Sequence, residues 1–180
     1  QNQLDATQKA AELAGFSYCE LLQEPIAASI AYRLDAKNME GYWLVFDFGG
    51  GTFDAALMKV NEGIMKVVDT EGDNHLGGKN IDFAIVDNLF IPKLKEDFNI
   101  NDILNDEVGK ILLRDSLKKY AEETKIDLSI KNMSSVYADD LGNDVNDNDI
   151  ILNLTISIDQ YELVVKPIFQ RSIDISKRLL

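Results

Sequence analysis

The chain has 180 residues and a formal charge of −13, from 18 Lys and Arg against 31 Asp and Glu. This acidity argues against nucleic acid and anionic membrane surfaces as partners, since both need clustered basic residues, and no run of about 18 apolar residues predicts a membrane span. With one cysteine, Cys19, and one histidine, an internal disulfide is impossible, a zinc site is nearly excluded, and a cytoplasmic setting is favoured.

The first 41 residues are expected to be mainly helical. Apolar spacing predicts a helix from Leu4 to Ala14, which Gly15 ends. A second helix, predicted over Ile26–Leu34, is opened by Glu24-Pro25 because proline is tolerated in a first helical turn.

A β-meander is predicted next. Tyr42–Phe48 is expected to be a buried strand, and two further strands follow at Thr52–Val60 and Ile64–Thr70. Glycine-containing segments at 49–51 and 61–63 supply the turns between them.

Two long helices are predicted after the meander. The first covers Asn80–Asp97 and should be kinked or broken by Pro92. Its expected inward residues are Ile81, Ile85, Leu89 and Leu94. The second covers Glu107–Asp127, with Val108, Ile111, Leu112 and Leu117 expected to face inward.

The remaining pattern is strand, loop, strand and helix. Strands are predicted at Ser134–Tyr137 and Ile150–Ser157, around an acidic loop at 138–149. The loop lacks the spacing and closing glutamate of a calcium loop, so it is interpreted as a solvated turn. Ser157 and Gln160 form a capping box for a last helix that runs toward Leu180 and contains Pro167.

The strongest local signal for chemistry is the segment Asp47-Phe48-Gly49-Gly50-Gly51-Thr52-Phe53-Asp54. Glycines without Cβ atoms let backbone N–H groups approach a phosphate, and Thr52 adds a hydroxyl donor. Asp47, at the end of a strand, could hold magnesium directly or through water. The alternative interpretation is a hairpin with a glycine-rich turn.

Other candidates are weak in isolation. Glu24 can simply complement a helix dipole, and Gly77-Gly78 lacks Walker spacing. His75 is more often structural than catalytic. Glu122, Lys125 and Ser129 share a helix face by their spacing, which on its own is usually a solvated charged face.

Taken in order, these segments resemble the DnaK-type heat-shock protein 70 chaperone family. The resemblance extends over essentially all 180 residues, most densely up to Asp87. Three motifs carry it: Gln23-Glu24-Pro25-Ile26-Ala27-Ala28, the segment from Asp47 to Asp54, and Gly72-Asp73-Asn74-His75-Leu76-Gly77-Gly78. Glu122, Lys125 and Ser129 fall where the family has its adenosine-contacting residues.

The resemblance implies an actin-like ATPase fold of the α/β class with an α+β outer subdomain, of which this chain is a part. Residues 1–41 would be the last helices of lobe I, 42–76 the inner β-meander of lobe II, 77–157 its outer subdomain, and 158–180 a returning helix. ATP or ADP with Mg²⁺, and K⁺ as a further ion, would be the ligands of the intact protein.

The resemblance also assigns roles to individual residues. Catalysis would involve Asp47, Glu24 and Thr52, and Asp47 and Asp54 would hold the metal. The nucleotide would be bound by eight residues: Gly49, Gly50, Gly51, Thr52, Gly78, Glu122, Lys125 and Ser129.

Several departures from the family pattern affect these expectations. Gln23 replaces an asparagine, Lys79 and Asn80 replace acidic residues, and Ile126 replaces an arginine that stacks on adenine. The Asp-x-Gly-Thr-Thr loop and the lysine of lobe I and the Gly-Gly-x-x-Arg-x-Pro segment are not in the sequence. The segment alone is therefore expected to bind ATP weakly or not at all and to be inactive.

The function implied is a cytoplasmic, stress-related chaperone ATPase. Its partners would be unfolded polypeptides, bound through a further C-terminal domain, together with J-domain co-chaperones and nucleotide-exchange factors. One alternative is a divergent relative that acts as a binding or co-chaperone module with weak or no ATPase. Another is a sugar kinase or filament protein of the same superfamily, against which the 75–78 and 122–129 segments argue.

Overall fold

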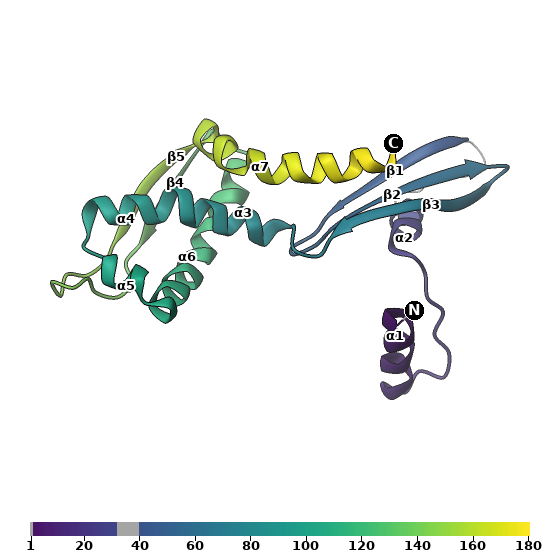
Figure 1. Ribbon diagram of the computed structural model, residues 1–180, viewed down its shortest axis with the longest axis horizontal. Coiled ribbons are helices and arrows are strands. Elements are labelled where there is room, and N and C mark those ends of the chain that lie inside the picture. Colours follow the sequence, from purple (N-terminus) through teal and green to yellow (C-terminus); the bar gives the residue numbers. More distant parts are fainter. Residues whose placement is uncertain (1, 32–39) are drawn as a thin grey trace. The chain divides into compact units, whose positions relative to one another are not determined.

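The computed structural model describes residues 2–31 and 40–180 (Figure 1). The helical segments are α1 Asn2–Leu13, α2 Glu24–Ala31, α3 Gly78–Ile85, the π-helical η1 Val86–Phe90, α4 Ile91–Asp97, α5 Asn101–Asn105, α6 Glu107–Leu128, α7 Ile158–Ser176 and the 3₁₀ turn η2 Lys177–Leu179. The strands are β1 Gly41–Phe48, β2 Phe53–Asn61, β3 Ile64–Asp73, β4 Met133–Ala138 and β5 Leu152–Ser157. The predicted mixed α/β class is confirmed, and the helix α5 was not predicted.

The chain divides into two compact units. Unit 1 comprises residues 1–46, 55–71 and 179–180, and unit 2 comprises residues 47–54 and 72–178. The predicted meander is confirmed as a three-stranded sheet in the order β1-β2-β3. The strand ends at 47–54 and 72–73 belong to unit 2.

Unit 1 buries its central strand and little else. The buried apolar residues of β2 in this unit are Ala55, Ala56, Met58 and Val60. The hydroxyl of Ser29 in α2 donates to the carbonyl of Pro25 at 2.7 Å and contacts the Met58 sulfur at 3.2 Å, which fixes α2 against β2. The last residues of the predicted second helix, 32–34, lie outside the described residues.

The prediction that β1 is a buried strand was wrong. Tyr42, Leu44 and Phe46 are all exposed, and the residues between them are half-buried. β1 is an edge strand in the described sheet, and its near-continuous apolar sequence resembles that of a strand covered on both faces. The sequence pattern therefore indicated more cover than the described residues supply.

Unit 2 has a continuous hydrophobic core. The antiparallel hairpin β4-β5, paired from Met133↔Ser157 to Ala138↔Leu152, packs with α6 and with the α3-η1-α4 helix (Figure 1). The fully buried side chains at its centre are Ile85, Val86, Phe90, Leu94, Leu117, Ala121, Ile150 and Leu152. Both predicted strands of this hairpin are confirmed, with β5 beginning two residues later than expected, at Leu152.

The helix predicted over Asn80–Asp97 contains a π-helical segment. The interruption expected at Pro92 takes the form of this π-helical segment, which ends at Phe90, two residues before the proline. Burial of Ile81, Ile85 and Leu94 is confirmed, whereas Phe90 is fully buried and Leu89 only partly. The extra residue in the π turn brings Phe90 onto the core side in place of Leu89.

α6 confirms the predicted boundaries but not the predicted inward face. Asp106 caps the helix by accepting the Gly109 N–H at 2.8 Å. Val108, Ile111 and Leu112 are exposed, and of the four residues expected to face inward only Leu117 is buried. The buried stripe consists of Leu113, Leu117, Ala121, Thr124 and Leu128. An apolar cluster in the first turns is therefore on the solvent side, and the small or polar Ala121 and Thr124 face the core.

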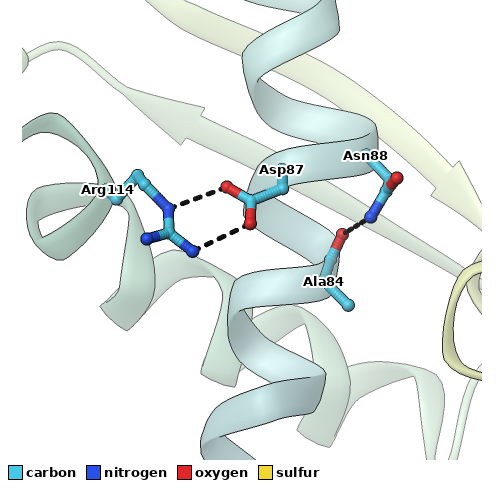
Figure 2. Close-up of polar contacts among 4 residues, drawn as sticks. All are labelled: Ala84, Asp87, Asn88 and Arg114. Carbon is cyan, nitrogen blue, oxygen red and sulfur yellow. Dashed lines mark hydrogen bonds and ion pairs between the residues drawn. The ribbon is translucent and has the colours of Figure 1, made fainter. Parts of the chain in front are cut away.

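An ion pair connects α6 to η1. Arg114 donates from Nε and Nη2 to the two carboxylate oxygens of Asp87, each at 2.8 Å, and Figure 2 shows this two-pronged contact. The Arg114 guanidinium also lies 4.5 Å from the centre of the Phe83 ring. On the same helical segment, the Asn88 side chain donates to the Ala84 carbonyl at 2.8 Å. The π-helical segment is thus held by a charged residue of the neighbouring helix.

The acidic loop is more ordered than a simple solvated turn. Asp144 is buried and accepts the backbone N–H groups of Asn146 and Asn148 at 2.9 and 3.0 Å, and that of Asn99 at 3.3 Å. These hydrogen bonds, that of Asn148 first, hold the pKa of Asp144 below its usual range. Among the described residues no group of three acidic, histidine or cysteine side chains could hold a metal.

The last helix begins as predicted. Ser157 accepts the Gln160 N–H, and the Gln160 side chain accepts the Ser157 N–H at 3.0 Å, which completes the capping box. Pro167 lies inside α7, as predicted, and the α-helix ends at Ser176 rather than continuing to Leu180. None of the helices in residues 2–31 and 40–180 has the length and apolar content that a bilayer crossing requires.

Candidate nucleotide site in unit 2

The glycine-rich turn closes the hairpin between β1 and β2. The Gly49 N–H donates to the Thr52 carbonyl at 2.9 Å, and the rings of Phe48 and Phe53 lie 6.0 Å apart. Because side chains alternate along a strand, Asp47 and Asp54 project from the face opposite this aromatic pair. Both carboxylates are exposed. Two like charges near one hairpin end oppose each other unless a cation is bound, so this end is chemically suited to one.

Packing within the chain explains only part of the glycine content. A Cβ on Gly77 would lie 2.7 Å from the Gly49 oxygen and from the Gly51 nitrogen, so this position requires glycine. A Cβ on Gly50 would meet nothing within 4 Å, and one on Gly51 would make only ordinary contacts with Lys79. Neither Gly50 nor Gly51 has a positive φ. The space above Gly50 is therefore open, and above Gly51 only the end of the Lys79 side chain lies nearby.

The start of α3 is bound to this turn by main-chain hydrogen bonds. The N–H groups of Gly78 and Lys79 donate to the carbonyls of Gly49 and Gly50 at 2.9 and 2.8 Å. The Asn80 side chain accepts the Gly77 N–H at 2.8 Å. The glycine turn and the first turn of α3 are consequently one piece of structure.

A buried carboxylate neutralises one lysine of the site. Lys125 of α6 donates to Asp82 of α3 at 2.6 Å, and the Asp82 side chain is 4% exposed while that of Lys125 is 23% exposed. The Lys125 ammonium lies 3.6 Å from where a Cβ on Gly78 would be. Burial, and secondarily the charge of Asp82, raise the pKa of the half-buried Tyr161. Lys125 is thereby oriented beside Gly78, at the start of α3.

Two further predicted nucleotide contacts lie on the same end of α6. Glu122 is exposed one turn before Lys125. Ser129 is the C-terminal cap of the helix, and its hydroxyl donates to the Ile126 carbonyl at 2.6 Å. Ile126 is 57% exposed, so this end of α6 presents an apolar side chain to solvent.

Most predicted site residues therefore lie in unit 2. Gly78, at the start of α3, is hydrogen-bonded to the turn from Asp47 to Asp54 and lies beside Lys125. Glu122 and Ser129 lie on α6 with Lys125. Glu24 is exposed in the first turn of α2 and belongs to unit 1. The exposed His75 takes part in a local turn, in which its N–H donates to Asp73 at 2.9 Å.

Asp82 was missed as a site residue. It lies between Ile81 and Ile85 on a helix that packs in the core, and a carboxylate in that position needs a partner. This conflict with the apolar pattern was a usable signal in the sequence. Its partner, Lys125, could not be identified from the sequence, because the two residues are 43 positions apart and only the fold brings them together.

The available ligands fit a nucleotide with magnesium better than a protein-only metal centre. No described group of three metal-ligating side chains exists, but Mg²⁺ is commonly held by one or two carboxylates, phosphate oxygens and water. Asp47 and Asp54 supply such carboxylates, and Gly50 and Gly51 leave room for phosphate.

Comparison with known proteins identifies the family of the chain. The family profile described as Hsp70 protein matches residues 1–180. The chaperone protein dnaK of Cyanidium caldarium is 42% identical over 135 residues, which are 75% of this chain and 21% of the relative. The DnaK chaperones of Thermosipho africanus (strain TCF52B) and Thermosipho melanesiensis (strain DSM 12029 / CIP 104789 / BI429) are 41% and 40% identical over 129 residues, or 72% of this chain. The matched segment spans about a fifth (21%) of these relatives.

Proposed function

Because the chain belongs to the Hsp70 protein family, we propose that it is part of an ATP-binding and ATP-hydrolysing domain that drives a chaperone cycle. The fold is that of an α/β part of an actin-like ATPase domain. In the intact protein, ATP turnover would control the binding and release of unfolded polypeptide. Residues 1–41 would end lobe I, 42–76 and 158–180 would belong to inner lobe II, and 77–157 would form outer lobe II.

One observation carries this proposal. Gly50 and Gly51 have no packing or backbone reason to be glycine in the described chain, whereas Gly77 does. Open glycines above a turn allow backbone groups to approach a phosphate closely. The Lys125 ammonium and Gly50 lie 3.6 and 3.7 Å from where a Cβ on Gly78 would be, so Lys125 is near enough to the turn to contact the nucleoside of the same ligand.

The residues then divide into three roles. Gly49, Gly50, Gly51 and Thr52 would hold the β- and γ-phosphates, and Asp47 and Asp54 would hold the metal, with Glu24 ordering metal-bound water. Gly78, Glu122, Lys125 and Ser129 would hold the ribose and base. Mg²⁺, when bound, neutralises charge that develops on the transferred phosphoryl group, and K⁺ is a further candidate ion.

The role of Asp47 is distinguishable from simple binding. A carboxylate that positions the metal contributes more to the transition state than to the ground state. In the full-length protein, Asp47→Asn should slow hydrolysis more than it weakens ATP binding. An unchanged single-turnover rate would exclude this role.

The central test compares glycines in the full-length protein. Gly50→Ala should weaken ATP binding about tenfold or more, because a methyl group would occupy phosphate space, while thermal stability stays unchanged. Calorimetric titration gives the affinity, and a melting curve gives the stability. Unchanged ATP affinity for Gly50→Ala would show that the space is not a phosphate site. The 180-residue segment alone is expected to bind ATP much more weakly than the full-length protein.

By the same family relationship, the partners would be unfolded polypeptides, a J-domain co-chaperone and a nucleotide-exchange factor, in the cytoplasm and under stress. Nucleic acid and membrane are not proposed as partners, given the charge of −13.

A second candidate function is favoured by Ile126. Without a cation over adenine, the protein would be a divergent relative that works as a binding or co-chaperone module with weak or no ATPase. Ile126→Arg in the full-length protein should tighten ATP binding by up to about thirtyfold if the base lies on this face. An unchanged dissociation constant would mean that another residue covers the base or that the helix register differs.

A further inference from the structure

Lys79 lies directly at the glycine turn. Its side chain passes over Gly51, with Cδ 3.9 Å and Nζ 4.0 Å from where a Cβ on Gly51 would be. Its own N–H donates to the Gly50 carbonyl at 2.8 Å, so the backbone of Lys79 is fixed to the turn. The ammonium is therefore held within reach of any ligand that occupies the open space above Gly50 and Gly51.

The two lysines near the start of α3 differ in their electrostatic surroundings. Lys125 is paired with the buried carboxylate of Asp82 at 2.6 Å. Lys79 is exposed, and no carboxylate within the described ranges forms an ion pair with it. Its charge is thus available in a chain whose net charge is −13.

The position of Lys79 is also unfavourable for the helix. It is the second residue of α3, and the first turn of this helix contains no acidic residue. The N-terminus of a helix carries a partial positive charge, so a lysine there is repelled rather than stabilised. A residue that is electrostatically unfavourable at its position, and has no compensating contact among the described residues, often indicates a ligand-binding site.

We propose that Lys79 is a phosphate-binding residue that places a side-chain cation against the terminal phosphates of a nucleotide held at the glycine turn. The assignment rests on the proposed function and adds to it a charged contact at a position where the related family has an acidic residue. Lysine binds phosphate as a point charge, and such charge-assisted hydrogen bonds are about twice as strong as neutral ones.

The test measures nucleotide affinity in the full-length protein. Lys79→Gln should weaken ATP binding about tenfold while leaving adenosine binding within about twofold, because only the phosphates contact the ammonium. Lys79→Arg should keep most of the affinity. Competition against a fluorescent adenine nucleotide gives all of the dissociation constants, and the loss for Lys79→Gln should shrink as salt concentration rises.

The control is Lys110→Gln, which removes an equal charge from an exposed lysine in the first turn of α6. It should leave both affinities unchanged. Equal losses for ATP and adenosine in Lys79→Gln would indicate a structural role and overturn the assignment. Unchanged ATP affinity in Lys79→Gln would overturn it while the proposed function stands, and an unsubstituted protein that binds no ATP would overturn both.

Discussion

The two units of this chain bury their apolar residues very differently. In unit 2 a single core connects two helical layers with the β4-β5 hairpin, and all of its fully buried members lie between Ile81 and Val165. In unit 1 the buried apolar residues come almost entirely from the central strand β2, while Tyr42, Leu44 and Phe46 of β1 are exposed. The buried indole N–H of Trp43 also has no acceptor among the described residues.

This difference in burial indicates that most of the folding stability of the segment comes from unit 2. Unit 2 contains the hydrophobic contacts that a domain needs, so its candidate phosphate turn is held by a complete core. Among the described residues of unit 1, few cover the apolar side chains of β1. We therefore expect unit 2 to behave as the cooperative unit and unit 1 to open locally.

Hydrogen exchange should show the largest contrast. α1 has 12 residues, its described side chains are almost all exposed, and isolated helices of this length are marginal in water. Amides of α6 and β5 should exchange at least about a thousandfold more slowly than those of α1, since they open only with the core. Hydrogen exchange of the chain, followed by mass spectrometry, measures these rates. Equal protection in α1 and α6 would contradict the expected difference in stability between the two units.

A matched pair of leucines on α6 tests the core of unit 2. Leu117→Ala should lower the free energy of unfolding by about 2–5 kcal/mol, because Leu117 is fully buried. Leu112→Ala, at a residue that is 62% exposed, should change it by no more than about 0.5 kcal/mol. Denaturant titration gives both values. A large effect at Leu112 would show that the first turns of α6 are covered in solution.

A second pair separates packing glycines from open ones. Gly77→Ala should cost about 1–3 kcal/mol of stability, because the new methyl group would collide with backbone atoms of the turn at 2.7 Å. Gly50→Ala should leave the unfolding free energy unchanged, since its methyl group would meet nothing within 4 Å. Thermal melts of both variants decide this. Equal destabilisation would mean that the turn packs more tightly than described.

The smallest expected effect is a pH dependence within unit 2. The pKa of Asp144 is lowered in the folded state, so its contribution to stability is present above the unfolded value of about 3.9 and is lost as pH falls through the folded value. Asp144→Ala should be less stable at pH 7 and should lose less stability between pH 5 and pH 3. Asp115→Ala, at an exposed residue of α6, is the control and should follow the unsubstituted protein.

Local signals in the sequence predicted most elements, and the reasons are physical. The capping box at Ser157 and the glycine turn after Phe48 depend on residues a few positions apart, so the sequence contains all that is needed. The inward face of α6 could not be predicted in this way. Its early apolar cluster suggested one side, but the position of the β4-β5 hairpin selected another, through Leu113 and Leu117.

The candidate site shows the same division. The phosphate turn could be proposed from Asp47, three glycines and Thr52 alone. The environment of Lys125 could not, because its partner Asp82 lies on a distant helix. The crowding of Gly77 against the turn was equally invisible, since it depends on how α3 returns to the hairpin.

The π-helical segment Val86–Phe90 has a consequence for how this helix can change in evolution. Its backbone hydrogen bonds connect residues five positions apart, so the turn contains one residue more than a turn of α-helix. Deleting a single residue there would restore α-helical hydrogen bonding, and the residues after it would keep their faces because the bulge already absorbs the offset of one residue, about 100°. Leu94, which is fully buried, would then stay in the core. This helix should therefore tolerate the loss of one codon within Val86–Phe90 better than the loss of one codon in the α-helical turns on either side.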